Sequence, residues 1–282
     1  MEDRDRVAVA VGNPDNVDQL VRTAIDVARD RGGEVVVVAV RVTPRESPFG
    51  LFTDEVIARE LGGERRALLD RAVDVASGTD VPVRGRLFVA GSVADGVLHA
   101  IDELDCGCLV VGWQDRTREN AILGTNVDRI VRRADADVLV EKIGAVADGV
   151  EAVLLPVAES PNADLAAAVA RAIAAGNDAR VDLLRVADSP AQEPAARELL
   201  ADASGRFGSV PVETEVRVGD VADAIVAASA DRDVTVLGAT RTGQIRRRVV
   251  GSTPRAVGRR AEGSVIVAKK RTPSLVGRLL GR

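Results

Sequence analysis

Two stretches of the chain place glycines and a hydroxyl residue at a spacing that suits the binding of a phosphate group. The residues are Gly112, Gly124 and Thr125 in the first stretch, and Gly238, Gly251, Ser252 and Thr253 in the second. Glycine permits close approach of the backbone, and a hydroxyl residue at a helix start can both cap the helix and bond a phosphate. The same residues would also suit a purely structural turn and helix cap.

Residues for other kinds of chemistry are sparse. We find no P-loop, zinc-protease motif or paired nucleophile and base, so the sequence predicts no enzyme, although slow ATP hydrolysis needs mainly positioning and charge. The only histidine is His99. Cys106 and Cys108 are two residues apart, so in a strand their side chains share one face, where a disulfide would be strained. We interpret them as packing thiols and expect no metal site.

An internal repeat explains why the glycine pattern occurs twice. Four segments recur in the same order 126 to 128 residues later: Gly91–Asp95 as Gly219–Asp223, Leu109–Gly112 as Thr235–Gly238, Gly124–Thr125 as Gly251–Ser252, and Val138–Val140 as Val265–Val267. Such a period is too long for a solenoid and suits a duplicated domain. We therefore expect one domain over residues 1–144, a second over 149–270, and a basic C-terminal tail over 271–282.

Apolar runs alternate with helical patterns in both copies. In the first copy we expect strands at 7–11, 35–42, 83–89, 108–112 and 137–142, and helices at 16–31, 54–77, 92–104 and 126–133. In the second copy we expect strands at 152–157, 181–186, 213–218, 234–238 and 264–268. Gly32 should end the first helix, and Ser92 should cap the third. Nearly continuous apolar strands alternating with helices predict an α/β fold: two tandem domains, each a five-stranded parallel sheet with helices on both faces.

The pattern after the fourth strand resembles that of the universal stress protein family, whose ATP-binding members carry Gly-x2-Gly-x9-Gly-Ser/Thr there. The resemblance spans nearly the whole chain. It implies a Rossmann-like (adenine nucleotide alpha hydrolase-like) fold, ATP with magnesium as the ligand, and a non-catalytic regulatory role. Neither copy matches fully, because Arg241 replaces the middle glycine in the second copy and Asp115 stands at that place in the first. The family's aspartate after the first strand is missing from residues 9–14 and 155–160.

The second copy is the stronger candidate for a nucleotide site. In doubly wound sheets, ligands bind at the carboxyl ends of strands, where the strand order reverses. The residues expected there are Pro156, Val157, Gly238, Arg241, Gly251, Ser252 and Thr253, with Arg246, Arg247 and Arg248 to neutralise phosphates. In the first copy Gly112, Gly124 and Thr125 remain candidates, but Asp115 would repel a polyphosphate. Trp113 could stack on a base or pack as a half-buried side chain.

The end of the chain is strongly basic. Residues 241–282 carry 12 basic residues and one acid, Glu262, a balance that would attract phosphate-bearing ligands, nucleic acid or an anionic membrane. Nucleic acid is the least favoured, because this part of the chain lacks aromatic side chains for base stacking. Residues 273–282 could form one or two amphipathic turns, which would be too short to anchor the chain alone. They could equally well dock on a partner or form a frayed end.

These observations favour a nucleotide-responsive stress or regulatory protein. The family precedent also suggests that residues 138–140 and 265–267 pair in an intramolecular pseudo-dimer, and it leaves a homodimer open. The alternative is a non-enzymatic module that docks on a membrane partner such as an amino-acid transporter. The sequence shows no secretory signal and no apolar run near the ~20 residues that a bilayer span requires, so we expect a cytoplasmic protein.

Overall fold

The computed structural model describes residues 4–43, 63–113, 124–144, 149–240 and 251–272. These residues divide into two compact units. The first unit comprises residues 4–43, 63–112, 124–139 and 271–272, and the second comprises 113, 140–144, 149–240 and 251–270. Among the described residues, no helix is both long enough and apolar enough to cross a membrane.

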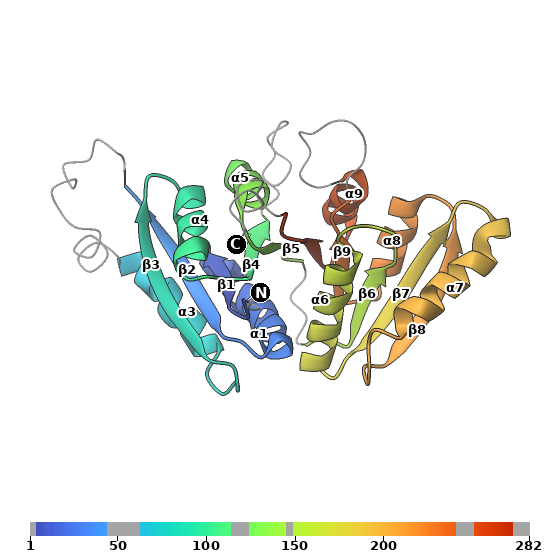
Figure 1. Cartoon of the computed structure of the whole chain (residues 1–282), viewed down its shortest axis with the longest axis horizontal. Coiled ribbons are helices and arrows are strands. Elements are labelled where there is room, and N and C mark those ends of the chain that lie inside the picture. The colour runs from blue at the N-terminus through green and yellow to red at the C-terminus, as the bar shows by residue number, and fades with distance from the viewer. Residues whose placement is uncertain (1–3, 44–62, 114–123, 145–148, 241–250, 273–282) are drawn as a thin grey trace, which may run out of the picture. The chain divides into compact units, whose positions relative to one another are not determined.

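The first unit is built on a sheet of strand order β3-β2-β1-β4-β5 (Figure 1). β1 pairs in parallel with β2 and β4, and β2 pairs in parallel with β3. Helices α1 and α3 pack on one face, whereas α4 and α5 lie together on the other. The elements are β1 (Val7–Val11), a 3-10 turn η1 (Pro14–Asn16), α1 (Val17–Arg31), β2 (Val35–Val42), α3 (Gly63–Val75), β3 (Val83–Ala90), α4 (Val93–Glu103), β4 (Cys108–Trp113), α5 (Thr125–Arg133) and β5 (Asp137–Lys142).

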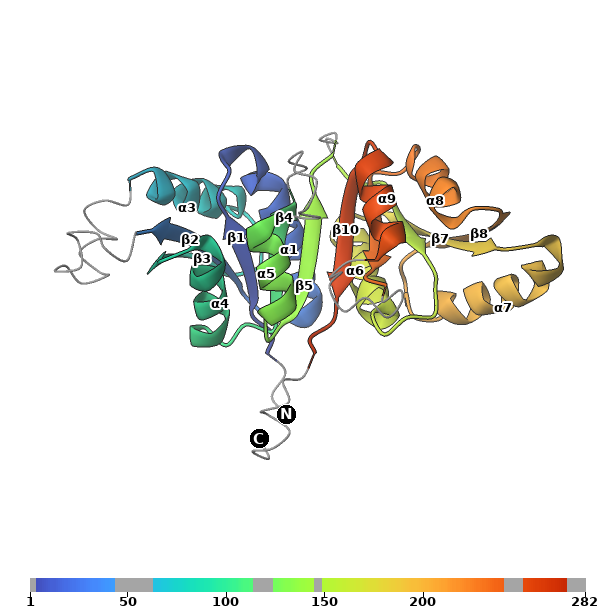
Figure 2. The same ribbon diagram turned by 90° about the horizontal axis from the view of Figure 1, so that it is seen from above.

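The second unit repeats this topology with the strand order β10-β9-β6-β7-β8 (Figure 2). β6 pairs in parallel with β7 and β9, β7 with β8, and β9 with β10. The elements are β6 (Ala152–Pro156), α6 (Ala163–Gly176), β7 (Arg180–Ala187), η3 (Pro190–Gln192), α7 (Glu193–Ser204), β8 (Val212–Val218), α8 (Val221–Ser229), β9 (Val234–Gly238), α9 (Ser252–Arg260) and β10 (Ser264–Lys269). The predicted α/β fold with two tandem parallel-strand domains is therefore confirmed.

The central strands consist almost entirely of small branched and apolar residues. In β1, Val7, Ala8 and Val9 are all 0% exposed, and the first six residues of β2 are buried as well. Branched side chains suit this environment because they pack well on a pleated surface that is covered on both sides. The continuous apolar runs in the sequence therefore reflect strands buried on two faces.

Helix ends follow the capping signals in the sequence. Gly32 adopts φ 67° and ends α1 in the left-handed conformation. The side chain of Ser92 accepts a hydrogen bond from the N–H of Asp95 at the start of α4, and Asp220 serves α8 in the same way. The predicted cap at Ser92 is confirmed. The helix expected from residue 16 begins at Val17, because Pro14–Asn16 first form a 3-10 turn.

A buried ion pair joins β7 to the turn between α8 and β9. Asp182 is 4% exposed and lies among apolar neighbours on β7. Its carboxylate accepts hydrogen bonds from Nε of Arg180 at 2.9 Å and from Nε of Arg232 at 2.8 Å. A carboxylate this deeply buried is tolerated only when cations and donors compensate its lost hydration.

Replacing this carboxylate should destabilise the second unit. We expect Asp182→Ala to lower the free energy of unfolding by about 3 kcal/mol, because Arg232 is left as a largely buried, uncompensated charge. Asp164→Ala is the matched control, since Asp164 pairs with Arg206 on the surface and should cost under about 1 kcal/mol. Urea unfolding followed by circular dichroism measures both, and equal losses would contradict a special role for the buried pair.

Candidate functional site

The carboxyl ends of β6 and β9 mark the place in the second unit where the strand order reverses. β6 lies between β7 and β9, so the predicted site residues Pro156, Val157 and Gly238 reach the same edge of the sheet. β6 pairs with β7 along its whole length but with β9 only at Val153 and Leu154. Strand pairing therefore stops short of the carboxyl ends, where ligands bind in sheets of this kind.

The loop after β6 covers the end of β9. A Cβ on Gly238 would lie 3.2 Å from Oγ of Ser160 and 3.4 Å from the backbone carbon and oxygen of Asn162. The Nδ2 of Asn162 donates a hydrogen bond to the carbonyl of Ala239, and its Oδ1 accepts one from the N–H of Lys270 at 2.8 Å. The absence of a side chain at Gly238 thus admits the protein's own loop.

Ser160 and Asn162 were not among the residues that the sequence analysis selected. A signal was available, because Asn16-Val17-Asp18 recurs as Asn162-Ala163-Asp164 after the first strand of each copy. An asparagine before a helix is the ordinary sign of an N-cap, so the sequence alone does not indicate the contact with Gly238.

Gly251, the second glycine of the pattern, lies against the residues that follow β9. A Cβ on Gly251 would lie 1.8 Å from Oγ1 of Thr240, so the position accepts only glycine. Gly251 is also the N-cap of α9 and offers no side chain to the first N–H groups of that helix. Ser252 is exposed and Thr253 is partly buried at this helix start. The hydroxyl oxygen of Thr240 is buried without a hydrogen-bond partner in the described part of the chain.

A cation reaches this edge of the sheet from β7. Nη1 of Arg185 donates a hydrogen bond to the carbonyl of Val157 at 3.1 Å, which uses one of the five N–H donors of a guanidinium. Arg185 could not be predicted as a site residue, because an arginine within an apolar strand gives no sign of which loop it contacts. Arg241 and residues 246–248, which were expected to supply the positive charge, lie outside the described residues.

At the corresponding edge of the first unit, backbone pairing continues closer to the carboxyl ends of the strands. There β1 stays paired with β4 as far as Ala10 and Val111, one step short of the end of β1. A Cβ on Gly112 would lie 3.3 Å from Cδ1 of Leu20, so this glycine makes room for α1. Gly124 adopts φ 92°, a conformation that favours glycine, and the exposed Thr125 follows it as the first residue of α5.

Two further residues of the first copy bear on ligand binding. Trp113 is 3% exposed, which is deeper than the half-buried packing role considered from the sequence and leaves no open ring face for a base. Asp128 adds a negative charge in the first turn of α5, where it competes with an anionic ligand. Asp115 lies outside the described residues.

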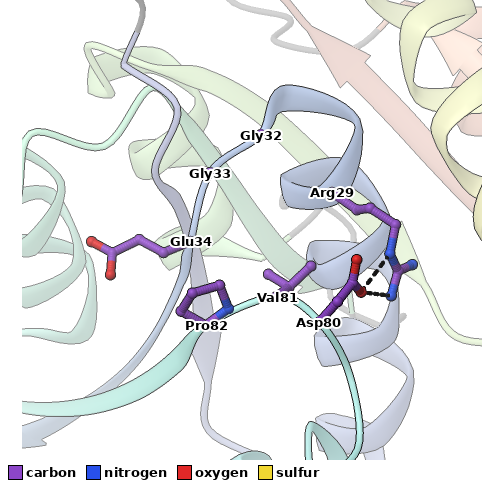
Figure 3. Close-up of a pocket in the computed structure, with 7 residues that line it drawn as sticks. All are labelled: Arg29, Gly32, Gly33, Glu34, Asp80, Val81 and Pro82. Atoms are coloured by element: carbon purple, nitrogen blue, oxygen red, sulfur yellow. Dashed lines mark hydrogen bonds and ion pairs between the residues drawn. The ribbon is translucent and has the colours of Figure 1, made fainter.

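A separate cavity of about 460 Å³ lies at the opposite end of the first unit's sheet, where β2 and β3 begin (Figure 3). Its lining residues are Arg29, Gly32, Gly33, Glu34, Asp80, Val81 and Pro82. Nε of Arg29 donates a hydrogen bond to Asp80 at 2.9 Å, and this bond lowers the pKa of the Asp80 carboxyl. The cavity is shallow. Arg29 pairs with Asp80, and Glu34 pairs with Arg6 and Arg84, so the charged residues that line it already have partners and we assign no ligand to it.

The two cysteines are buried and carry free thiols. Burial raises the pKa of Cys106 to about 11 and that of Cys108 to about 12. A thiol reacts or binds metal as the thiolate, and such pKa values keep the thiolate scarce at neutral pH. Within the described ranges, no group of three or more His, Cys, Asp and Glu residues could hold a metal ion.

The thiols should make the protein less stable at high pH. Because the folded-state pKa values lie above the reference value of 9.0, the native state holds these protons more tightly than the unfolded state does. The resulting stabilisation is present below about pH 9 and is lost as the pH rises toward about 11. Melting temperatures between pH 8 and 10.5 should fall more steeply for the natural protein than for a Cys106→Ala, Cys108→Ala variant. Parallel profiles would contradict the raised pKa values.

The contact at Gly251 gives a second expectation. Gly251→Ala should lower the free energy of unfolding by about 1–3 kcal/mol, because its methyl group would overlap the Thr240 side chain. Gly149→Ala is the control, since a Cβ at Gly149 meets nothing within 4 Å. Chemical unfolding compares the two variants, and a neutral Gly251→Ala would show that the residues after β9 move aside easily.

Comparison with known proteins identifies the family to which the chain is similar. The model of the Universal stress protein family matches residues 3–142 and 149–269. Among solved structures, the chain is similar to a universal stress protein from Archaeoglobus fulgidus DSM 4304, at 17% identity over 94% of this chain and 96% of that chain, with a TM-score of 0.66. It is also similar to a functionally unknown protein from Pseudomonas aeruginosa PAO1, at 17% identity, 94% and 92% coverage and a TM-score of 0.61.

A third similar structure is the cytoplasmic domain of a prokaryotic cation chloride cotransporter, at 14% identity, 98% and 99% coverage and a TM-score of 0.62. At these identities the structural likeness concerns the fold alone. No curated protein matches the chain. Because the family match covers both copies and most of the sequence, the chain belongs to the universal stress protein family.

Proposed function

We propose that the chain is a regulatory protein that binds an adenine nucleotide, ATP with magnesium, at the carboxyl ends of β6 and β9. The proposed organisation is the one expected from the sequence, with domains over residues 1–144 and 149–270 and a basic tail over 271–282. Membership of the universal stress protein family supports this proposal, since its ATP-binding members carry the glycine and hydroxyl pattern discussed above.

The start of α9 carries the proposal. Gly251 leaves the first N–H groups of the helix without a side-chain cap, and the hydroxyls of Ser252 and Thr253 stand beside them. A helix N-terminus attracts anions because its N–H groups and its dipole both favour negative charge. In the same unit, the buried Thr240 hydroxyl lies against Gly251, where it can serve as a further donor.

The cation on the other side of β6 complements the helix start. Arg185 contacts Val157, so its guanidinium lies at the same edge of the sheet as Pro156 and Gly238. Arginine pairs strongly with phosphate oxygens through charge-assisted hydrogen bonds. We assign Pro156 and Val157 to the wall of the site, and we keep Arg241 as a predicted contributor.

We propose binding and regulation for this chain, with no catalytic role. Slow hydrolysis of ATP is compatible with the arrangement, because phosphoryl transfer needs mainly positioning and charge. The pairing of residues 138–140 with 265–267, the homodimer and the cytoplasmic location stay predictions. The likeness to a cotransporter's cytoplasmic domain makes a module that docks on a membrane transporter the second candidate.

Calorimetric titration with ATP and magnesium tests the proposal. We expect about one nucleotide per chain, and we expect Ser252→Asp to weaken binding at least about tenfold, because a carboxylate at the first position of α9 repels phosphates. The same substitution suits a helix N-terminus, so the fold should be retained. Thr125→Asp is the matched control, since Thr125 is the exposed first residue of α5 in the other unit.

The two variants separate the possible sites. Unchanged binding in Thr125→Asp, with loss in Ser252→Asp, supports a nucleotide site in the second unit. The reverse result would move the site to the first unit. No binding of the natural protein at millimolar ATP would contradict the proposal and favour the transporter-docking module.

A further inference from the structure

Both units begin their first full helix with an asparagine that does not cap it. Asn16 precedes α1 with φ −104° and ψ −6°, and Asn162 precedes α6 with φ −104° and ψ 1°. Asparagine is among the strongest N-cap residues because its side chain usually accepts a hydrogen bond from the helix's own first turn. Neither side chain makes that bond. The second unit shows where its asparagine is used instead.

Asn162 bonds the ends of two strands that do not neighbour its own loop in sequence. Its amide group donates to the carbonyl of Ala239, just after β9, and accepts from the N–H of Lys270, just after β10. Asn162 is 8% exposed, and its bond to Ala239 is buried while its bond to Lys270 is partly buried. Losing either partner would leave a polar group of this amide unsatisfied, which is unfavourable.

The same residue lies over the proposed nucleotide site. Ser160 and Asn162 rest on Gly238, at the place where β6 and β9 are no longer paired. A ligand that packs against the end of β9 must move this loop outward. That movement breaks the bond to Lys270, because a single side chain holds both contacts.

We propose that Asn162 is a latch that couples the loop at residues 157–162 to the backbone N–H of Lys270, just after β10. The proposal rests on the proposed nucleotide function. In the closed state Asn162 holds the loop down and ties Lys270 to it. In the open state the loop makes room for the nucleotide, and the N–H of Lys270 loses its partner.

The latch makes ligand binding and exposure of the Lys270 N–H a single equilibrium. A nucleotide that fits only the open state shifts the population toward it, and the closed state lowers the apparent affinity in proportion to its population. Occupation of the site is thereby converted into a change at the end of β10.

Hydrogen exchange of the Lys270 amide in the full chain tests the latch. In the natural protein, saturating ATP with magnesium should accelerate this exchange about tenfold or more, since the closed state protects the N–H. In Asn162→Ala the exchange should be fast without nucleotide and should not change on its addition, and ATP should bind several-fold more tightly. Asn177→Ala is the control, because Asn177 bonds the carbonyl of Ile173 at the far end of α6 and should leave Lys270 protected.

The outcomes separate the latch from the proposed function. ATP that binds the natural protein without changing Lys270 exchange overturns the latch and leaves the function intact. Slow exchange of the Lys270 amide in Asn162→Ala also overturns the latch.

If ATP binds neither protein, the proposed function fails. The latch is then decided by comparing exchange in the natural protein and in Asn162→Ala without ATP. Faster exchange at both Lys270 and Ala163 in Asn162→Ala then supports a latch between the loop and Lys270. Should Asn162→Ala not fold, Asn162→Asp keeps the acceptor for Lys270 but loses the donor to Ala239, so only the loop amides should exchange faster.

Discussion

The position of β6 between β7 and β9 governs the second unit. A strand at this point must satisfy backbone groups on both sides, yet β6 completes its pairing only with β7 and leaves β9 after two residue pairs. The unpaired groups beyond that point need other partners, because buried backbone donors and acceptors are costly to leave unsatisfied. The side chain of Asn162 supplies one such partner to the carbonyl of Ala239, and it also accepts a hydrogen bond from the N–H of Lys270 after β10. The candidate site therefore exists where backbone pairing ends and a side chain takes over.

Sequence reasoning captured the fold because the fold follows from local patterns. The valine-rich runs, the helical spacing and the cap at Ser92 are each readable within a few residues. It did not capture how the site is closed, since Asn162 contacts residues 77 and 108 positions away along the chain. The glycines illustrate the same limit. Their spacing indicated close approach, but only the structure shows that Gly251 makes room for Thr240.

The two copies share one topology but differ at the carboxyl ends of their central strands. In the first unit the pairing of β1 with β4 continues to Ala10, whereas the equivalent pairing in the second unit ends earlier. Gly124 holds a positive φ of 92° that favours glycine, while Gly251 has φ −65° and is required for space instead. Glycines at equivalent positions of the two copies are thus required for different physical reasons. The same residue type at equivalent positions of a repeat therefore does not by itself identify the same role.

The burial of Trp113 has a consequence for how this molecule can be observed. The chain contains one tryptophan and no tyrosine, so its intrinsic emission under ultraviolet excitation comes almost entirely from the indole at the end of β4. That indole is 3% exposed, and its emission should shift to longer wavelength once water reaches it. The natural protein therefore contains a single-site optical probe that needs no label.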